Sequence, residues 1–505
     1  MGTGDVHLPA GVSAGQVEGR LLGAGTLPAA WGKGFAATPD RRVLWSAEAG
    51  WLTAGALDAA SRRVAGRFHR AGLRPGDRIL MSAAASAAYV TAHLAAMRLG
   101  LVVVPANPAY REREVAHLVT DAEPAAAVVD DPDRAAWVRR AAPGAVVVAT
   151  PEVDLPDGPG DHPALDAAAP GDPALLGYTS GTTGAPKGAV LSHANLLATT
   201  EAVRLAWRWN ADDRLVLALP LFHMHGLGVG LHGTLLAGAS VVLLPRFDPD
   251  AVLDAARHHA ATLFFGVPTM YSRLATSPRL AELGRLRLCV SGSAPLPPAV
   301  FSRVAAGGGQ PPLERYGMTE TGMNVSNPHD GERRPGTVGF PLPGVELGLA
   351  GEGGAPGEIL LRGPNVFSGY WRNAAATEEA FADGWFRTGD IGELDDRGYL
   401  RIAGRRTELI ITGGYNVYPR EVEDVLATHP RVAEVAVAGV ADEEWGEVVT
   451  AWVVPAGDPP EEKDLLAHAA GQLAAFKCPR AVHFVAALPR NAMGKLLRHQ
   501  LGARL

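Results

Sequence analysis

Helical and strand-like patterns alternate along the first part of the chain. Apolar residues recur at helical spacing over residues 57–73 and again over residues 87–100. Each helical stretch is followed by a short apolar run, RILMSAA at 78–84 and LVVVPAN at 101–107, which is typical of a buried strand. This alternation predicts layers of helices against a sheet with parallel strands.

The pattern continues and then changes character after Gly339. Short β-rich pieces follow, at residues 345–350, 357–363, 398–404 and 407–414. Past Gly404 a compact βαβ-like region combines helical and strand-like stretches. We therefore predict an α/β fold with a large N-terminal domain of α/β layers and a β-rich subdomain (residues 1–403), followed by a small, mobile α+β C-terminal domain (residues 404–505).

Length, composition and charge narrow the class of protein. A chain of 505 residues is too long for a single hydrophobic core, and 47% hydrophobic with 20% charged residues is an ordinary globular composition. The net charge of −7 and the absence of a long Lys/Arg run argue against nucleic acid as a partner. Two cysteines, no signal-like N-terminus and no apolar run of about 20 residues predict a cytoplasmic protein without a transmembrane segment.

A loop rich in glycine and hydroxyl side chains offers the first candidate chemistry. Residues 178–188, YTSGTTGAPKG, lie between two strand-like runs. Glycine lets backbone N–H groups approach phosphate oxygens, hydroxyl groups donate further hydrogen bonds, and Lys187 adds a positive charge. The Gly-Lys-Ser/Thr ending of a P-loop NTPase is absent. We therefore predict that this segment, the phosphate loop, wraps a polyphosphate.

The phosphate loop closely resembles the signature of the adenylate-forming superfamily, which includes acyl-coenzyme A synthetases, luciferases and the adenylation domains of peptide synthetases. Five further segments resemble motifs of that superfamily in the same order: SGSAP at 291–295, YGMTET at 316–321, RTGD at 387–390, Gly404–Arg405, and NAMGK at 491–495. The resemblance extends from about Trp51 to Lys495. Six ordered motifs make a chance match very improbable.

The resemblance implies a role for each matching residue. Tyr316 would flank adenine, Thr319 would contact the α-phosphate, and Asp390 would accept hydrogen bonds from the ribose hydroxyls. Glu320, together with Thr182, would hold Mg²⁺, and Lys495 would bridge the acyl carboxylate and the α-phosphate. The other residues expected to contact ATP are Thr179, Ser180, Gly181, Thr183, Lys187, Ser291, Gly292, Ser293, Ala294, Glu314, Arg315, Gly317, Met318 and Arg405.

The implied activity has two steps. A carboxylic acid is activated by ATP to an acyl adenylate with release of pyrophosphate, and the acyl group then passes to coenzyme A after the C-terminal domain rotates. ITGGYNVY at 411–418 resembles the face presented to coenzyme A, with Gly413, Gly414 and Tyr415 in contact. The hinge position two residues after Arg405 is Thr407, where relatives often carry Asp or Lys.

Three stretches, at residues 219–230, 266–274 and 314–347, look most like malonyl-coenzyme A synthetases. In that group a His, an Arg and a Ser hold the distal carboxylate, and the matching positions are His223, Arg273 and Ser293, with Gly317 and Met318 nearby. His223 is counted among the catalytic candidates as well. A buried second carboxylate needs a cationic partner, and arginine offers two parallel hydrogen bonds.

Other hypotheses stay open at this point. The substrate could be a medium-chain or aromatic acid, or another oxyanion such as nitrite, with transfer to an acyl carrier protein or an amine. GGYNVYPREVE at 413–423 resembles fatty acyl and aryl acyl ligases more than malonate enzymes. A non-catalytic nucleotide-binding scaffold is disfavoured by the intact Lys187, Glu320, Asp390 and Lys495.

Overall fold

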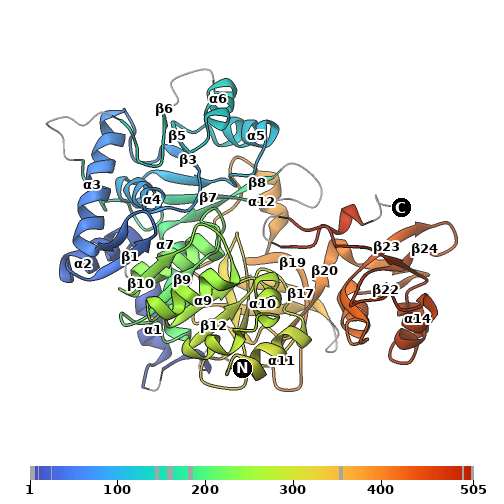
Figure 1. Cartoon of the computed structure of the whole chain (residues 1–505). Coiled ribbons are helices and arrows are strands. Elements are labelled where there is room, and N and C mark those ends of the chain that lie inside the picture. The colour runs from blue at the N-terminus through green and yellow to red at the C-terminus, as the bar shows by residue number, and fades with distance from the viewer. Residues whose placement is uncertain are drawn as a thin grey trace.

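The computed structural model describes residues 6–9, 11–23, 25–142, 147–155, 163–179, 186–351, 356–491 and 494–501. Two large sheets with their helices form the bulk of the molecule, a β-rich sheet lies toward its C-terminal side, and a small domain projects from it (Figure 1). The predicted fold class is confirmed, including the small α+β domain at the C-terminal end.

The larger N-terminal sheet has nine strands, of which the central ones are parallel. Antiparallel strands β2, β14 and β15 complete its edges. In spatial order the strands are β15 (Phe340–Pro341), β14 (Gly322–Ser326), β13 (Leu313–Met318), β12 (Leu288–Ser291), β11 (Leu263–Gly266), β9 (Arg214–Leu217), β10 (Ser240–Leu243), β1 (Arg42–Ser46) and β2 (Gly50–Thr53).

The second N-terminal sheet has six strands, and it carries the phosphate loop at one edge. Its strands are parallel except for the last pair, β7 and β8, which run antiparallel on either side of the loop. In spatial order they are β6 (Val147–Ala149), β5 (Ala126–Val129), β3 (Arg78–Ser82), β4 (Val102–Pro105), β7 (Pro173–Thr179) and β8 (Lys187–Ser192).

Two smaller antiparallel sheets complete the chain. The β-rich sheet contains β16 (Glu346–Ala350), β17 (Gly357–Arg362), β19 (Trp385–Leu394), β18 (Phe381–Ala382) and β20 (Leu400–Arg405). The C-terminal domain contains β22 (Tyr415–Val417), β21 (Ile410–Thr412), β24 (Gly446–Pro455), β23 (Val432–Asp442) and β25 (Ala481–Phe484). Only β25 pairs in parallel, with β24, across the helix α14. The boundary near Gly404 stays a prediction.

The helices begin where the sequence supplies capping side chains. Ser86 accepts a hydrogen bond from the N–H of Tyr89, and Gly100 ends the same helix with φ +80°. The α-helices are α1 (Ala14–Gly23), α2 (Leu27–Ala37), α3 (Ala54–Arg70), α4 (Ala87–Leu99), α5 (Glu112–Ala122), α6 (Pro132–Ala141), α7 (His193–Ala206), α8 (His232–Leu236), α9 (Pro249–His258), α10 (Pro268–Ala275), α11 (Pro298–Gly307), α12 (Ala374–Ala380), α13 (Pro419–Leu426) and α14 (Glu462–Ala470).

The main hydrophobic core joins the two large sheets. Helix α4 is buried along almost its whole length and contacts both β4 of one sheet and β1 of the other. A helix that is apolar on all sides can be stable only inside such a core, where every face meets protein. The sheets are thereby fixed to each other, and with them the loops at their edges. Over the described residues, no helix has both the length and the apolar character needed to cross a membrane.

Candidate active site

The two ends of the phosphate loop are held by one helix. Thr179 and Lys187 pair in register where β7 ends and β8 begins. The hydroxyl of Tyr178 donates to Oδ2 of Asp121 at 2.5 Å, and Nε2 of His117 lies 2.9 Å from the carbonyl oxygen of Pro186. Both anchoring side chains belong to α5, which therefore fixes where the loop leaves and rejoins the sheet.

Part of the predicted phosphate site lies outside the described residues. This concerns Ser180, Gly181, Thr182 and Thr183, including the predicted contribution of Thr182 to a metal site. Thr179 and Lys187 are described and stand on adjacent strands.

Thr319 approaches the strand that leads into the phosphate loop. Its Cγ2 lies 2.3 Å from the position that a Cβ atom on Gly177 would occupy, which is closer than real Cβ contacts come. Gly177 is part of β7, and Thr319 directly follows β13. The absence of a side chain at residue 177 thus lets the YGMTET segment pack against β7, directly before the phosphate loop.

Gly177→Ala should therefore push these two segments apart. We expect the KM for ATP to rise about tenfold with a loss of about 1–3 kcal/mol in stability, because overpacking forces the backbone to shift. Steady-state pyrophosphate release and thermal unfolding would measure both. The matched control is Gly34→Ala, since a Cβ at Gly34 meets no atom within 4 Å. An unchanged KM for ATP in Gly177→Ala would show that the contact between Gly177 and Thr319 does not determine the position of the phosphate loop.

Glu320 is a buried carboxylate facing the same region. Glu320 is only 5% exposed, and this burial raises the pKa of its carboxyl group. The hydroxyl of Tyr370 donates to Oε1 of Glu320 at 3.1 Å. On the same tyrosine, Nζ of Lys187 lies over the ring, 5.4 Å from its centroid.

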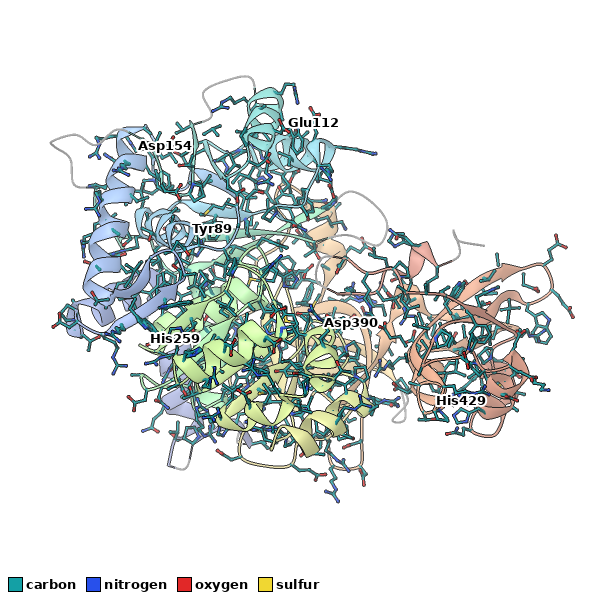
Figure 2. The ribbon with its side chains drawn as sticks, viewed as in Figure 1. Tyr89, Glu112, Asp154, His259, Asp390 and His429 are labelled. Atoms are coloured by element: carbon teal, nitrogen blue, oxygen red, sulfur yellow. The ribbon has the colours of Figure 1, made fainter. Side chains whose placement is uncertain are left out.

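Asp390 links the predicted adenine side of the site to the end of the β-rich sheet. Tyr316 donates its hydroxyl to Oδ2 of Asp390 at 2.6 Å, and Nε of Arg405 lies 3.0 Å from Oδ1. These three residues come from β13, β19 and β20. Figure 2 shows Asp390 where the large N-terminal body meets the C-terminal domain.

Lys495 reaches this region from the C-terminal domain on a tight loop. Asn491 closes the loop, because its N–H donates to the carbonyl oxygen of Lys495 at 2.9 Å and its Oδ1 accepts from the N–H of Lys495 at 3.0 Å. Burial lowers the pKa of Lys495, the nearby Arg405 guanidinium lowers it further, and the carboxylate of Asp390 opposes them. Lys495 therefore lies near Arg405 and Asp390, two of the residues predicted to contact the nucleotide, and its catalytic role stays a prediction.

Two neutral histidines stand beside the SGSAP segment. Oγ of Ser293 lies 3.3 Å from Nδ1 of His225, and Ser293 has the left-handed φ of +73°. Burial lowers the pKa of His223 to about 4, and Arg315 and Lys495 lower it further. Burial lowers the pKa of His225 as well, again with help from Arg315. Both imidazoles are therefore uncharged at neutral pH.

Arg315 is a buried cation, and sequence reasoning had assigned it only to the nucleotide. It is 4% exposed, and its Nε and Nη2 have no hydrogen-bond partner among the residues that the structure describes. Its Cζ lies 2.4 Å from where a Cβ on Gly292 would stand, so the glycine makes room for the guanidinium. Burial alone lowers the pKa of Arg315 to about 9, so it remains charged at neutral pH. No sequence signal distinguishes an unpartnered arginine from a paired one.

Arg273 occupies a different environment. It is exposed, and its guanidinium lies over the ring of Phe247, 5.1 Å from the centroid. It lines the mouth of a cavity of about 480 Å³, whose wall also contains Phe222 and, from the loop of Lys495, Gly494. The contacts of Arg273 do not bring it to Ser293, which lies against His225. Its predicted role in holding a carboxylate stays a prediction.

The remaining predicted residues fall on two elements. Ser291 ends β12, so that Gly292, Ser293 and Ala294 follow at the carboxyl edge of the sheet, while Glu314 to Met318 lie within β13. Oε1 of Glu314 accepts from the N–H of Leu296 at 2.9 Å, and burial raises the pKa of Glu314 to about 7. Glu314 thus supports the backbone that follows SGSAP.

The predicted coenzyme A face is a hairpin on the C-terminal domain. Gly413 and Gly414 have φ values of +55° and +82° between β21 and β22, a conformation that favours glycine. Tyr415 is 57% exposed and stacks on Phe476, with ring centroids 4.6 Å apart.

Comparison with known proteins identifies the family. The model for AMP-binding enzymes matches residues 33–371, and the model for the C-terminal domain of AMP-binding enzymes matches residues 421–495. The chain belongs to the AMP-binding enzyme family. It is therefore an acid–CoA ligase, which uses ATP to form an acyl adenylate and transfers the acyl group to coenzyme A.

Members of this family with different acids resemble the ligase over most of its length. The feruloyl-CoA synthase of an Amycolatopsis species is 39% identical over 466 residues, which cover 90% of this chain and 94% of the relative. The sulfoacetate–CoA ligase of Cupriavidus necator is 36% identical over 92% of this chain and 94% of its own length. MatB from Rhodopseudomonas palustris, a malonyl-CoA synthetase solved with ATP bound, is 40% identical with a TM-score of 0.88, over 94% of this chain and 98% of MatB.

Proposed function

We propose that the ligase activates a short dicarboxylic acid, malonate or a close relative, and that Arg315 binds its distal carboxylate. The observation that carries this proposal is the buried guanidinium of Arg315, whose Nε and Nη2 have no hydrogen-bond partner among the described residues. A charge removed from water is strongly destabilising unless a counter-charge meets it, and no carboxylate among the described residues is paired with Arg315. A substrate carboxylate would supply that counter-charge.

The surroundings of Arg315 favour an anion over an extended apolar chain. His223 and His225 are neutral and can donate hydrogen bonds, and the hydroxyl of Ser293 stands beside them. Behind His225 the ring of Phe265 stacks at 6.3 Å between centroids, and the buried Trp207 packs on Phe265. This aromatic packing leaves an acid with little depth beyond the histidines.

The relatives support the same class of acid. MatB is a malonyl-CoA synthetase, and sulfoacetate carries a sulfonate beside its carboxylate, so both acids combine a short chain with a second anionic group. Because another relative is a feruloyl-CoA synthase, an aromatic acid is the alternative substrate. An arginine is suited to all such anions, because its fork donates two parallel hydrogen bonds.

The nucleotide site has a donor set that fits ATP with magnesium. Glu320 is buried and accepts a hydrogen bond from the hydroxyl of Tyr370, and a buried carboxylate next to a polyphosphate needs a cation between them. We propose that Glu320 and Thr182 hold Mg²⁺, which when bound would offset the charge of the triphosphate. Tyr316 and Asp390, which are joined by a hydrogen bond, would contact adenine and ribose, and Thr319 and Lys187 would contact the phosphates.

The chain's own residues then act by position and charge. In adenylation an oxygen of the substrate carboxylate bonds to the α-phosphorus while the bond to pyrophosphate breaks, and no protein nucleophile is needed. Lys495 would hold the attacking carboxylate against the α-phosphate and offset the charge that gathers on the phosphoryl oxygens. Its loop brings it to Asp390 and Arg405, where the nucleotide is expected.

The second step needs a different arrangement of the C-terminal domain. We propose that the domain turns about the link near Gly404 to Thr407 and presents Gly413, Gly414 and Tyr415 to coenzyme A. Gly404 has φ +156° and can accommodate such a change.

None of the relatives named above is described as acting on a carrier protein. We place the ligase in the cytoplasm, because both of its cysteines are unpaired.

A panel of acids assayed by pyrophosphate release, with and without coenzyme A, tests this function. We expect malonate and methylmalonate to give the highest kcat/KM, and butyrate, hexanoate, ferulate and nitrite to give far lower values. A preference for ferulate or hexanoate would overturn the dicarboxylate assignment. ATP binding without turnover of any acid would instead support a scaffold.

The exposed Arg273 should matter less than Arg315. We expect Arg273→Met to lower kcat/KM for malonate by no more than about fivefold, because an exposed charge interaction is worth at most about 1 kcal/mol. Pyrophosphate release with malonate and butyrate measures the change. A far larger loss of kcat/KM that is specific to malonate would show that Arg273, and not Arg315, binds the distal carboxylate.

A further inference from the structure

The backbone around Tyr370 is attached directly to the strand that follows the phosphate loop. The N–H of Trp371 donates to the carbonyl oxygen of Gly188 at 2.7 Å, and the N–H of Val190 donates to that of Gly369 at 3.0 Å. Tyr370 therefore faces Ala189 as an extra piece of strand beside β8. Residues nearly two hundred positions apart are thus in fixed register.

The same segment also holds the backbone of Glu320. The N–H of Phe367 donates to the carbonyl oxygen of Glu320 at 2.9 Å, and the ring of Phe367 meets that of Tyr370 edge-on at 4.9 Å. The N–H of Tyr370 donates in turn to Oγ1 of Thr377 at 2.9 Å. The position of Tyr370 is consequently fixed by the packing of Phe367 against its ring and by the hydrogen bond of its backbone N–H.

Tyr370 contacts two groups of opposite charge, one through its hydroxyl and one through its ring. The carboxylate of Glu320 accepts the hydroxyl at 3.1 Å, while the ammonium of Lys187 lies over the ring face at 5.4 Å from its centroid. A carboxylate and an ammonium that both reach the same tyrosine attract each other, and the ring stands between them. An ion pair between the two groups would withdraw both from the ligands they are expected to bind.

We infer that Tyr370 is a positioning residue that keeps Glu320 and Lys187 apart and directed toward the metal and the phosphates of ATP. The inference rests on the proposed function, in which Glu320 holds the metal and Lys187 contacts the triphosphate. The hydroxyl satisfies the buried carboxylate without neutralising it, and the ring face attracts the ammonium by a cation–π interaction. Each charge thus has a partner that does not cancel it.

Two substitutions separate the hydroxyl from the ring. Tyr370→Phe keeps the ring and should raise the Mg²⁺ concentration needed for half-maximal ATP binding by about fivefold, with ATP affinity at saturating Mg²⁺ unchanged. Tyr370→Leu also removes the ring, and should weaken ATP binding at saturating Mg²⁺ by about tenfold because Lys187 can now pair with Glu320. Titration calorimetry of ATP binding at a series of Mg²⁺ concentrations measures both without turnover.

The control is Tyr399→Phe, since the hydroxyl of Tyr399 donates at 2.8 Å to the carbonyl oxygen of Glu332, away from the site residues described above. Thermal unfolding of each variant reports whether the fold is intact, and Tyr370→Phe carries the test if Tyr370→Leu unfolds. Wild-type Mg²⁺ dependence in Tyr370→Phe, together with a shifted dependence in Glu320→Gln, would overturn the inference and leave the proposed function standing. Unchanged Mg²⁺ dependence in Glu320→Gln as well would remove the metal role on which both depend.

Discussion

Replacing Lys495 with alanine should lower the rate of adenylate formation by about 10²–10³-fold, the cost of removing one preorganised group that meets developing charge. The loop of Lys495 places it within electrostatic reach of Asp390 and Arg405. Single-turnover pyrophosphate release would measure the loss. Thioester formation from a supplied acyl adenylate should be much less affected, because the phosphoryl chemistry is complete by then.

The matched control for this variant is Lys463→Ala, since Lys463 is exposed and pairs only with Glu461 at 2.6 Å in the described chain. An equal loss in both half-reactions would refute the division of labour.

The pH dependence of adenylation gives a further check on Lys495. Because the pKa of Lys495 is lowered, its charge and the adenylation rate should be lost, as pH rises, below the usual range of a lysine.

Replacing Arg315 with methionine should abolish most of the preference for malonate over butyrate. We expect kcat/KM for malonate to fall by about 10²–10³-fold, because a substrate carboxylate would be buried without a counter-charge, while butyrate should lose little. Methionine fills a similar volume and leaves the space beside Gly292 occupied. Pyrophosphate release with the two acids gives the ratio.

Two outcomes would contradict this role of Arg315. An unchanged ratio of malonate to butyrate would remove it from the acid site, and an equal fall with both acids would assign it to the nucleotide, as the sequence motif alone suggested. Arg273→Met is the companion variant, because it removes a guanidinium that lies over Phe247 at the cavity mouth.

Much of the fold could be predicted because its signals are local. The spacing of apolar residues over 57–73 and 87–100 predicted helices that the structure has as α3 and α4, with parallel strands β3 and β4 following them. The ordered motifs likewise predicted that Tyr316, Asp390 and Lys495 would converge. The helices and strands follow from patterns that neighbouring residues carry, whereas the convergence of the three site residues was implied by the resemblance to the adenylate-forming superfamily.

The positions of Arg315 and Tyr370 could not be predicted in the same way. Arg315 stands one residue before Tyr316 in a nucleotide motif, and only its burial and its unpartnered nitrogens set it apart. Tyr370 acquires its partners from Lys187 and Glu320, which are distant in sequence and meet through β8 and the turn after β13. Tertiary packing decides both, and no local pattern reports it.

The cavity beside the catalytic loop has a wall built from two parts of the chain. Most of its lining comes from the N-terminal body, but Gly494 closes one side and packs against Thr269 of α10 with φ +73°. In the domain rotation proposed above, Gly494 would leave this wall. The cavity would then be more open after the rotation than during activation, and an enzyme truncated near residue 403 would lack this side of the wall altogether.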